Sequence, residues 1–393
     1  MKENSMTADF FGYLRENNRV GIRNYVGVIS DMDNVNPIAK NIVDNVQGTV
    51  LITDLFGRKQ MGVNYDLRFK TMAGLGGNPN LAAVIVVGLH KPSAMALAEA
   101  ISESGKEVEC IVYQEIGSTL KCMEHGVRAA VKLVKKCSTM RRTPLPLSTL
   151  KIGVECGGSD FSSGIAGNSA IGVASDKLLD VGGTVVLSET AEVMGAEHIL
   201  AKRAVNQNVA NKLLKAVEEI NQLSEMAGVP DIRKSNPSVD NKKGGLTTLA
   251  EKSLGSIQKA GSKPLKDVLD YGEPIPIDSS GFYFMSTPTP ACESMTAMAA
   301  GGVQTIVFNT GVGNPAAHPV TPTIKVTGNP YTTEKSTDDL DVVVSHIISA
   351  GMSVEEAGER IFDEMIAVAN GKMTVSEILK TTQSAISIIG ASF

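Results

Sequence analysis

Residues 153–164 form the run whose side chains are best suited to chemistry. Among its glycines and small hydroxyl residues lie one thiol, Cys156, and one carboxylate, Asp160, with Ser159 beside it. Residues 151–154, which lead into the run, are typical of a strand, and the residues after the run are typical of a helix. In such a turn the glycines let the backbone approach a ligand, and the helix start presents free N–H groups to an anion. The run therefore predicts a site for a small anionic molecule.

Acidic residues and a histidine follow the next predicted strand, residues 184–187. These residues are Glu189, Glu192 and His198. Because neighbouring parallel strands end at the same edge of a sheet, they would meet Cys156 there. Oxygen and imidazole ligands beside a thiol suit iron, manganese or magnesium better than a thiolate-only site does. Taken singly, each also has an ordinary interpretation: a small buried thiol, solvated helix carboxylates, and a hydrogen-bonded helix histidine.

Lysines in and beside a Gly-Gly-Leu-Thr-Thr turn are the predicted anion-binding groups. A glycine pair flanked by lysines and hydroxyls would form a cradle for a carboxylate or a sulfonate. A buried lysine can also have a depressed pKa and act as a base, which makes Lys252 a candidate catalytic residue. The alternative is a loop of solvated lysines, the usual state of this residue type. The candidate cradle comprises Lys242, Gly244, Gly245 and Thr247.

Further polar groups extend the predicted substrate site. Arg23 is the last of three arginines spaced every four residues and would clamp an anion; the alternative is a solvated basic surface. Arg58 and Gln60 follow the predicted strand at residues 49–53, where a parallel sheet places its ligand; the alternative is capping of a helix start. Thr287 follows another predicted strand, and alone its position is weak support.

Composition excludes several classes of protein. The 393 residues are 42% hydrophobic and only 4% aromatic, with no Trp and a net charge of −5. Few aromatics and no basic excess argue against a nucleic-acid-binding surface. The five cysteines are odd in number and form no Cys-x-x-Cys, which favours reduced thiols in a cytoplasm over a disulfide framework. No signal peptide is expected at the polar N-terminus, and no apolar run reaches membrane-spanning length.

The elements that must position these residues alternate between strand and helix. Residues 24–30, 49–53, 81–88 and 108–113 read as strands with a helix after each, and the order strand–helix resumes at residue 151. This alternation predicts an α/β fold with parallel sheets. We expect a Rossmann-like N-terminal domain at residues 1–140, a polar, proline-containing linker at 138–149, and a larger catalytic α/β domain at 150–393.

The motifs together resemble the large subunit or core domain of altronate and galactarate dehydratases. The likeness spans nearly the whole chain in one order, which makes it far more specific than any single motif. The matching stretches include Gly21-Ile22-Arg23-Asn24, Asn78-Pro79-Asn80, Glu155-Cys156-Gly157-Gly158-Ser159-Asp160, Leu187-Ser188-Glu189-Thr190-Ala191-Glu192, Gly195-Ala196-Glu197-His198, Lys243-Gly244-Gly245 and Glu251-Lys252-Ser253-Leu254-Gly255.

The resemblance implies a lyase that removes water from a sugar acid such as altronate or galactarate. It implies a divalent metal, Fe²⁺ first and Mn²⁺ or Mg²⁺ as alternatives, with Cys156, Glu189, Glu192 and His198 as ligands. With it, Glu189, His198 and Lys252 become the expected catalytic residues. It also implies a small partner subunit, because the extra domain of the dehydratases is not seen before Gly12. A homo-oligomer is expected, without nucleic-acid or membrane partners.

One departure changes the expected leaving group. Where the dehydratases carry thiols in their N-terminal half, this chain has Leu55-Phe56-Gly57-Arg58-Lys59-Gln60 and no cysteine. This segment looks more like the large subunit of sulfolactate sulfo-lyase, which eliminates sulfite from a 2-hydroxy acid. Two alternatives stay open: a non-catalytic subunit whose site has decayed, and a nucleotide-dependent enzyme, which the missing Gly-x-Gly-x-x-Gly weakens.

Overall fold

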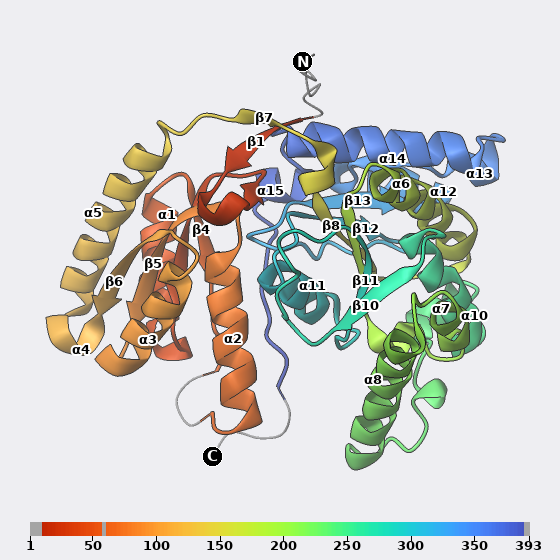
Figure 1. Cartoon of the computed structure of the whole chain (residues 1–393), viewed down its shortest axis with the longest axis horizontal. Coiled ribbons are helices and arrows are strands. Elements are labelled where there is room, and N and C mark those ends of the chain that lie inside the picture. The colour runs from red at the N-terminus through yellow and green to blue at the C-terminus, as the bar shows by residue number, and fades with distance from the viewer. Residues whose placement is uncertain (1–9, 57–59, 389–393) are drawn as a thin grey trace.

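The chain folds into two parallel α/β layers joined side by side, as the computed structural model in Figure 1 shows. The structure describes residues 10–56 and 60–388. The prediction of an α/β fold with parallel sheets is confirmed.

The N-terminal sheet has four parallel strands in the order β4-β3-β5-β6. Its elements are β3 (Tyr25–Ser30), α1 (Asn36–Asn45), β4 (Thr49–Ile52), α2 (Val63–Gly77), β5 (Leu81–Gly88), α3 (Lys91–Ser102), β6 (Glu107–Val112), α4 (Tyr113–Ile116) and α5 (Thr119–Cys137). Every residue of β5 is buried, as a near-continuous Val/Ile/Leu strand between two helix layers must be.

The C-terminal sheet has seven parallel strands in the order β10-β11-β9-β8-β12-β13-β14. Its strands are β8 (Lys151–Cys156), β9 (Thr184–Leu187), β10 (Leu265–Leu269), β11 (Gly281–Met285), β12 (Thr305–Asn309), β13 (Thr323–Thr327) and β14 (Val342–Val343). Its helices are α6 (Asn168–Asp180), α7 (Glu197–Lys202), α8 (Gln207–Met226), α9 (Val239–Lys243), α10 (Leu249–Ser256), α11 (Ala291–Ala300), α12 (Pro330–Lys335), α13 (His346–Ser349), α14 (Val354–Ala369) and α15 (Val375–Leu379).

A small antiparallel sheet, β2-β1-β7, lies where the two larger layers meet. It consists of β1 (Phe10–Leu14), β2 (Val20–Gly21) and β7 (Thr143–Leu145). The segment expected to be a linker therefore contains a paired strand, because β7 hydrogen-bonds along β1. The division into two domains at residues 138–149 stays a prediction.

Buried side-chain amides fasten the two layers together. Asn80 donates from Nδ2 to the carbonyls of Gln304 and Val320 at 2.7 and 2.9 Å. Asn78 donates in the same way to the carbonyls of Ala299 and Val303 at 2.8 and 2.9 Å. Both asparagines are fully buried. These bonds fix the N-terminal layer against α11 and the start of β12, since a buried amide without partners is costly.

Arg23 makes a second set of contacts that holds distant parts of the chain together. Its five N–H groups bind Glu377 and the carbonyls of Ile22, Val368 and Lys372, at distances of 2.7–2.9 Å. No donor is left for a substrate, so the prediction that Arg23 binds substrate is wrong. Instead the bidentate pair with Glu377 ties the N-terminal strands to α15.

Candidate active site

Side chains at the carboxyl ends of two neighbouring strands form a buried cluster. Cys156 is the last residue of β8, and Glu189 and Glu192 lie just beyond β9, the parallel neighbour of β8. Each is at most 2% exposed. The sequence predicted this meeting, and the parallel pairing of β8 with β9 produces it.

Cys156 lies at the centre of the cluster. Its Sγ is 3.2 Å from Oε2 of Glu192 and 3.9 Å from Oε2 of Glu189. Its backbone N–H donates to the same Glu189 oxygen at 3.3 Å. One ligand atom from each of the three residues lies within 4.8 Å of the others. A thiolate with two carboxylates can bind a divalent transition metal, so this triad is a candidate metal centre.

Two lysines reach the cluster from α10 and the 3-10 turn after it (Ile257–Ala260). Lys252 and Lys259 are two helical turns apart and share one face. Nζ of Lys252 lies 2.7 Å from Oε1 of Glu192. Nζ of Lys259, which is fully buried, lies 3.1 Å from Oε2 of Glu189 and 2.8 Å from Sγ of Cys156. The two ammonium groups therefore balance charge that the interior could not otherwise hold.

Glu155 extends the cluster beneath α11. Its Oε2 accepts from the hydroxyls of Ser294 and Ser188 at 2.7 and 3.1 Å. Oε1 of Glu155 and Oε1 of Glu189 are buried, and no N–H or hydroxyl donor of the described residues reaches either. The charge of Glu155 adds to the rise in the pKa of Glu189, because two adjacent buried carboxylates repel each other.

Burial is the main cause of the shifted pKa values in the cluster. It raises the pKa of Glu155 to about 7 and the pKa of Glu189 well above its usual range, with the charges of Glu155 and Glu192 adding to the second shift. Burial also raises the pKa of the Cys156 thiol, and Glu192 adds to it. Burial alone would lower the pKa of Lys259, but the acidic groups around it outweigh burial and raise it. The shifts thus favour the uncharged forms of Glu155, Glu189 and Cys156 and the charged form of Lys259.

The backbone at Glu189 is strained in a way typical of functional sites. Its φ is +69°, which a residue with a side chain rarely adopts. The hydroxyl of Thr287 accepts the Glu189 N–H at 2.8 Å and donates to the carbonyl of Pro288. Thr287, predicted to bind substrate, thus positions Glu189 from within the protein.

A cleft of about 560 Å³ has residues of the Asp160 turn and of α9 in its wall, and none of the clustered side chains lines it. Asn241 connects the cleft wall to the cluster: its Nδ2 donates to the Ser159 carbonyl at 2.8 Å, and its Oδ1 accepts from Lys252 at 3.2 Å. Oγ of Ser159 is buried and has no partner among the described residues. The cleft is lined by Asp160, Phe161, Asp240, Lys243, Gly244, Gly245, Val312, Asn329 and Tyr331. Three residues of the predicted substrate site, Asp160 and the glycine pair, are among them.

Other predicted site residues lie outside the cluster. His198 is exposed on α7 and is not among the ligand atoms that meet at Cys156, so its expected metal role is not supported. Lys242 is exposed, and so is Thr247, whose N–H and hydroxyl bind Glu251. Gln60 is buried in the N-terminal layer. Arg58 lies outside the described residues.

Lys259 and Glu155 are the functional residues that the sequence reasoning missed. Lys259 stands seven residues after Lys252, and this helical spacing could have identified it. Glu155 is a lone carboxylate in an apolar strand, and such a buried charge needs a partner. Its partner Ser294 lies 139 residues away, so the local sequence gave no sign of it.

A parallel α/β fold with a cleft and with buried acidic, thiol and ammonium groups defines an enzyme equipped for proton transfer. The chain belongs to the D-galactarate/altronate dehydratase family. Residues 147–392 match the model "D-galactarate/Altronate dehydratase, C-terminal", and residues 12–138 match "D-galactarate dehydratase/Altronate hydrolase, second domain".

The relatives are lyases, as the sequence predicted. The chain is 36% identical to the (2R)-sulfolactate sulfo-lyase subunit beta of Chromohalobacter salexigens, over 94% of this chain and 95% of that subunit. It is 32% identical to the altronate dehydratase of Bacillus subtilis, over 94% of this chain and 75% of that enzyme. The altronate dehydratase of Escherichia coli is also 32% identical, over 93% and 74%. No described helix is long and apolar enough to cross a membrane.

Proposed function

We propose that this chain is the large subunit of a lyase that eliminates sulfite from a small 2-hydroxy sulfonate such as sulfolactate. The carrying observation is the buried cluster of Cys156, Glu189, Glu192 and two lysines, which offers both a proton acceptor and positive charge. The leaving group is argued from the relatives. The chain spans 95% of the sulfo-lyase subunit but only about three quarters of the altronate dehydratases. Dehydration of a sugar acid is the second candidate, favoured by the 32% identity to those dehydratases.

In the proposed reaction Glu189 accepts the proton from the carbon that bears the hydroxyl. The electron pair of that C–H bond forms the C=C bond, and the C–S bond breaks with its pair leaving on sulfite. The enol that remains tautomerises to a 2-keto acid. Lys259 and Lys252 stabilise the negative charge that builds on the substrate carboxylate, in a site from which water is excluded.

We propose that Cys156, Glu189 and Glu192 hold a divalent cation, Fe²⁺ first and Mn²⁺ or Mg²⁺ as alternatives. The donor set fits such an ion, and the buried Oε1 of Glu189 has no donor from the described residues. A bound cation would polarise the substrate as a Lewis acid. Metal analysis of protein purified without oxygen should find about one cation per chain, and much less in Cys156→Ser.

We further propose a small partner subunit, a homo-oligomer and a cytoplasmic location. The printed name of the sulfo-lyase relative, a "subunit beta", supports the partner. The free cysteines among the described residues are consistent with a reducing compartment.

The test uses the protein together with its partner subunit and iron. Sulfolactate, altronate and galactarate are added in turn as substrates. Release of sulfite supports the first candidate, and a 2-keto-3-deoxy product supports the second. Glu189→Gln should lower kcat by about 10²–10⁴, the range for loss of a general base. His198→Ala and the nearby Glu197→Gln should keep activity. Silence with every substrate, or full activity of Glu189→Gln, would overturn the proposal.

A further inference from the structure

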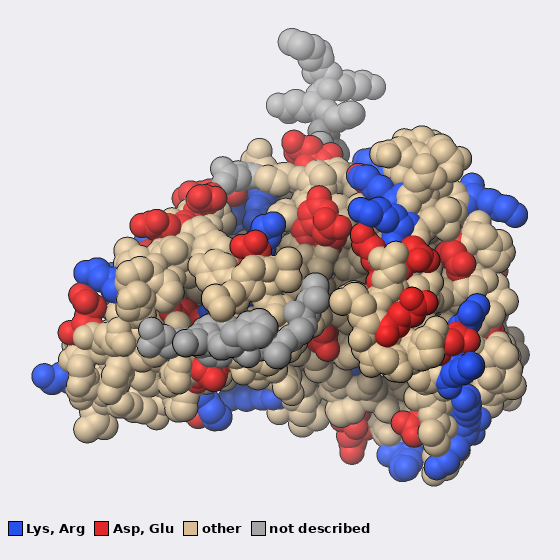
Figure 2. All heavy atoms as spheres, turned by 90° about the horizontal axis from the view of Figure 1, so that it is seen from below, with Lys and Arg blue, Asp and Glu red and all other residues tan. Residues whose placement is uncertain are grey.

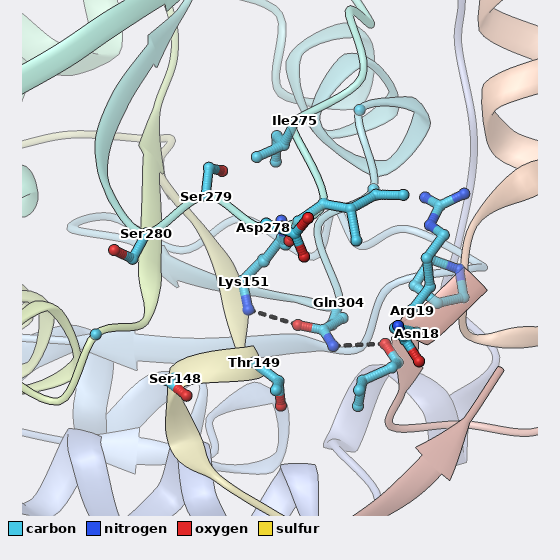
Figure 3. Close-up of a pocket in the computed structure, with 16 residues that line it drawn as sticks. Asn18, Arg19, Ser148, Thr149, Lys151, Ile275, Asp278, Ser279, Ser280 and Gln304 are labelled. Carbon is cyan, nitrogen blue, oxygen red and sulfur yellow. Dashed lines mark hydrogen bonds between the residues drawn. The ribbon is translucent and has the colours of Figure 1, made fainter. Parts of the chain in front are cut away.

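A second cavity, of about 490 Å³, lies at the opposite end of the C-terminal sheet (Figure 3). Lys151, the first residue of β8, lines it, whereas Cys156 ends the same strand in the catalytic cluster. Five residues of strand separate the two sites by about 16 Å. Asn18, Arg19 and Val20 close the cavity from the N-terminal side, so both layers contribute to it.

Neither cation of this cavity forms an ion pair with a carboxylate of the described residues. Nζ of Lys151 donates to the carbonyls of Pro276 and Ile277 at 2.6 and 3.1 Å. Arg19 donates from Nη1 to the carbonyl of Gly77 at 3.0 Å, and no acceptor among the described residues binds its Nε or Nη2. No described carboxylate oxygen lies within 4.0 Å of either cation. Asp278 lines the cavity but does not reach that distance.

The pKa shifts of the lysines near this cavity agree with the absence of an ion pair there among the described residues. Burial, and then the charge of Arg19, lowers the pKa of Lys151 to about 8, although the charge of Asp278 opposes this shift. Burial and the charges of Arg19 and Arg15 also lower the pKa of Lys106, whose Nζ caps the end of α2 through the carbonyls of Gly76 and Asn78. Positive charges that lose water without forming an ion pair destabilise the protein, and an anion in contact with them would relieve this.

Hydroxyl groups surround the cations on the cavity wall. Ser148 and Ser280 are exposed and their hydroxyls bind no described residue, whereas Ser279 and Thr149 bond to nearby carbonyls. Gln304, labelled in Figure 3, is already used: it accepts from the Lys151 N–H and donates to the carbonyl of Val20. The donors left for a ligand are therefore Nε and Nη2 of Arg19, the remaining Nζ–H of Lys151 and the hydroxyls of Ser148 and Ser280.

We propose that this cavity is a second binding site, separate from the catalytic cluster, for a small polyanion bearing phosphate or carboxylate groups. The ligand would contact Arg19 from one layer and Lys151 from the other. It would stabilise the junction on which the whole fold depends, as any ligand of the folded state does.

The experiment measures binding of inorganic phosphate and of citrate to the full chain by calorimetry and thermal denaturation. Sodium chloride holds the ionic strength constant. We expect either anion to raise Tm above the chloride control. Lys151→Gln and Arg19→Gln should each weaken the Kd by about tenfold, the effect of losing one charge-assisted contact. A response to phosphate but not citrate would identify a phosphorylated ligand, and the reverse a polycarboxylate.

Controls separate this site from other anion binding. Lys40→Gln removes the same charge from an exposed position on α1 and should bind like the wild type. Cys156→Ser should also bind normally, since it alters only the catalytic cluster. Ser148→Asp places an acid on the exposed rim and should weaken binding even if a cation variant fails to fold. No rise in Tm, or equal Kd values in all variants, would overturn the proposal.

Discussion

Replacing Lys259 by Met should leave two buried acidic groups without the ammonium that they share. Lys259 is fully buried, with Glu189 and Cys156 both in contact with its Nζ. Methionine fills a similar volume, so the change tests charge more than packing. Removing one partner of a buried ion pair costs about 3–5 kcal/mol, because the remaining charge keeps its desolvation penalty. That is a large share of the about 5–15 kcal/mol that holds a typical protein folded.

The assay is urea unfolding of the metal-free protein at pH 7, followed by circular dichroism. A loss of about 3–5 kcal/mol should appear as a lower urea midpoint with an unchanged m-value. The double variant Lys259→Met/Glu189→Gln should recover much of the loss, because it removes the charge left behind.

A matched control lies four residues further along the chain. Lys263 pairs with Asp180 at the surface, with side chains 36% and 62% exposed. Lys263→Met should therefore have little effect on stability, because solvent screens an exposed ion pair. If Lys259→Met were no more destabilising than this control, the reasoning about the buried cluster would be refuted.

Three further changes test the fold around the site. Glu377→Gln should destabilise the protein by about 3–5 kcal/mol at pH 7. Burial raises the pKa of Glu377, but Arg23 lowers it by more, so the folded-state pKa lies below the unfolded value of about 4.3. The stability that this ion pair contributes is therefore present above that value and is lost in acid. The gap in Tm between variant and wild type should hence close as the pH falls towards 3. Gly172→Ala puts a Cβ 2.2 Å from the carbonyl oxygen of Gln258, in the turn that carries Lys259, and should cost about 1–3 kcal/mol in urea unfolding. Gly77→Ala is the control, because its Cβ would lie 3.8 Å from the nearest atom and should cause no such loss. Equal stabilities of the two variants would contradict the packing. Burial lowers the pKa of Lys325 to about 7, so between pH 7 and 10 the folded state binds fewer protons than the unfolded state. The stability of the wild type, relative to that of Lys325→Met, should therefore rise from pH 7 to 10. Parallel stability profiles of the two proteins over this pH range would rule this out.

The sequence predicted the parts of the site that local pattern determines. Strand β9 has the predicted bounds, and β8 begins where predicted, because short apolar runs bounded by glycines read clearly as buried strands. Their parallel order then places Cys156 beside Glu189. What it could not predict depends on partners distant in sequence. The strand β7 has three residues and forms only because β1, at the other end of the N-terminal layer, pairs with it.

The errors at single residues have the same origin. His198 follows Glu192 closely in sequence, but α7 begins between them and leaves the imidazole exposed. Arg23 looked like an anion clamp because its partner Glu377 lies 354 residues away. A residue's type and spacing show what it is able to bind, whereas the fold decides what is within reach.

The buried asparagines at the junction also limit how the enzyme can move. A hinge motion that separated the two layers would break the hydrogen bonds that the side-chain amides of Asn78 and Asn80 donate, in a place that water does not reach. Turnover must then rely on small displacements of the segments around the cleft rather than on a hinge. For the same reason, a protease that nicks the connection between the layers should yield fragments that stay associated until the whole molecule is denatured.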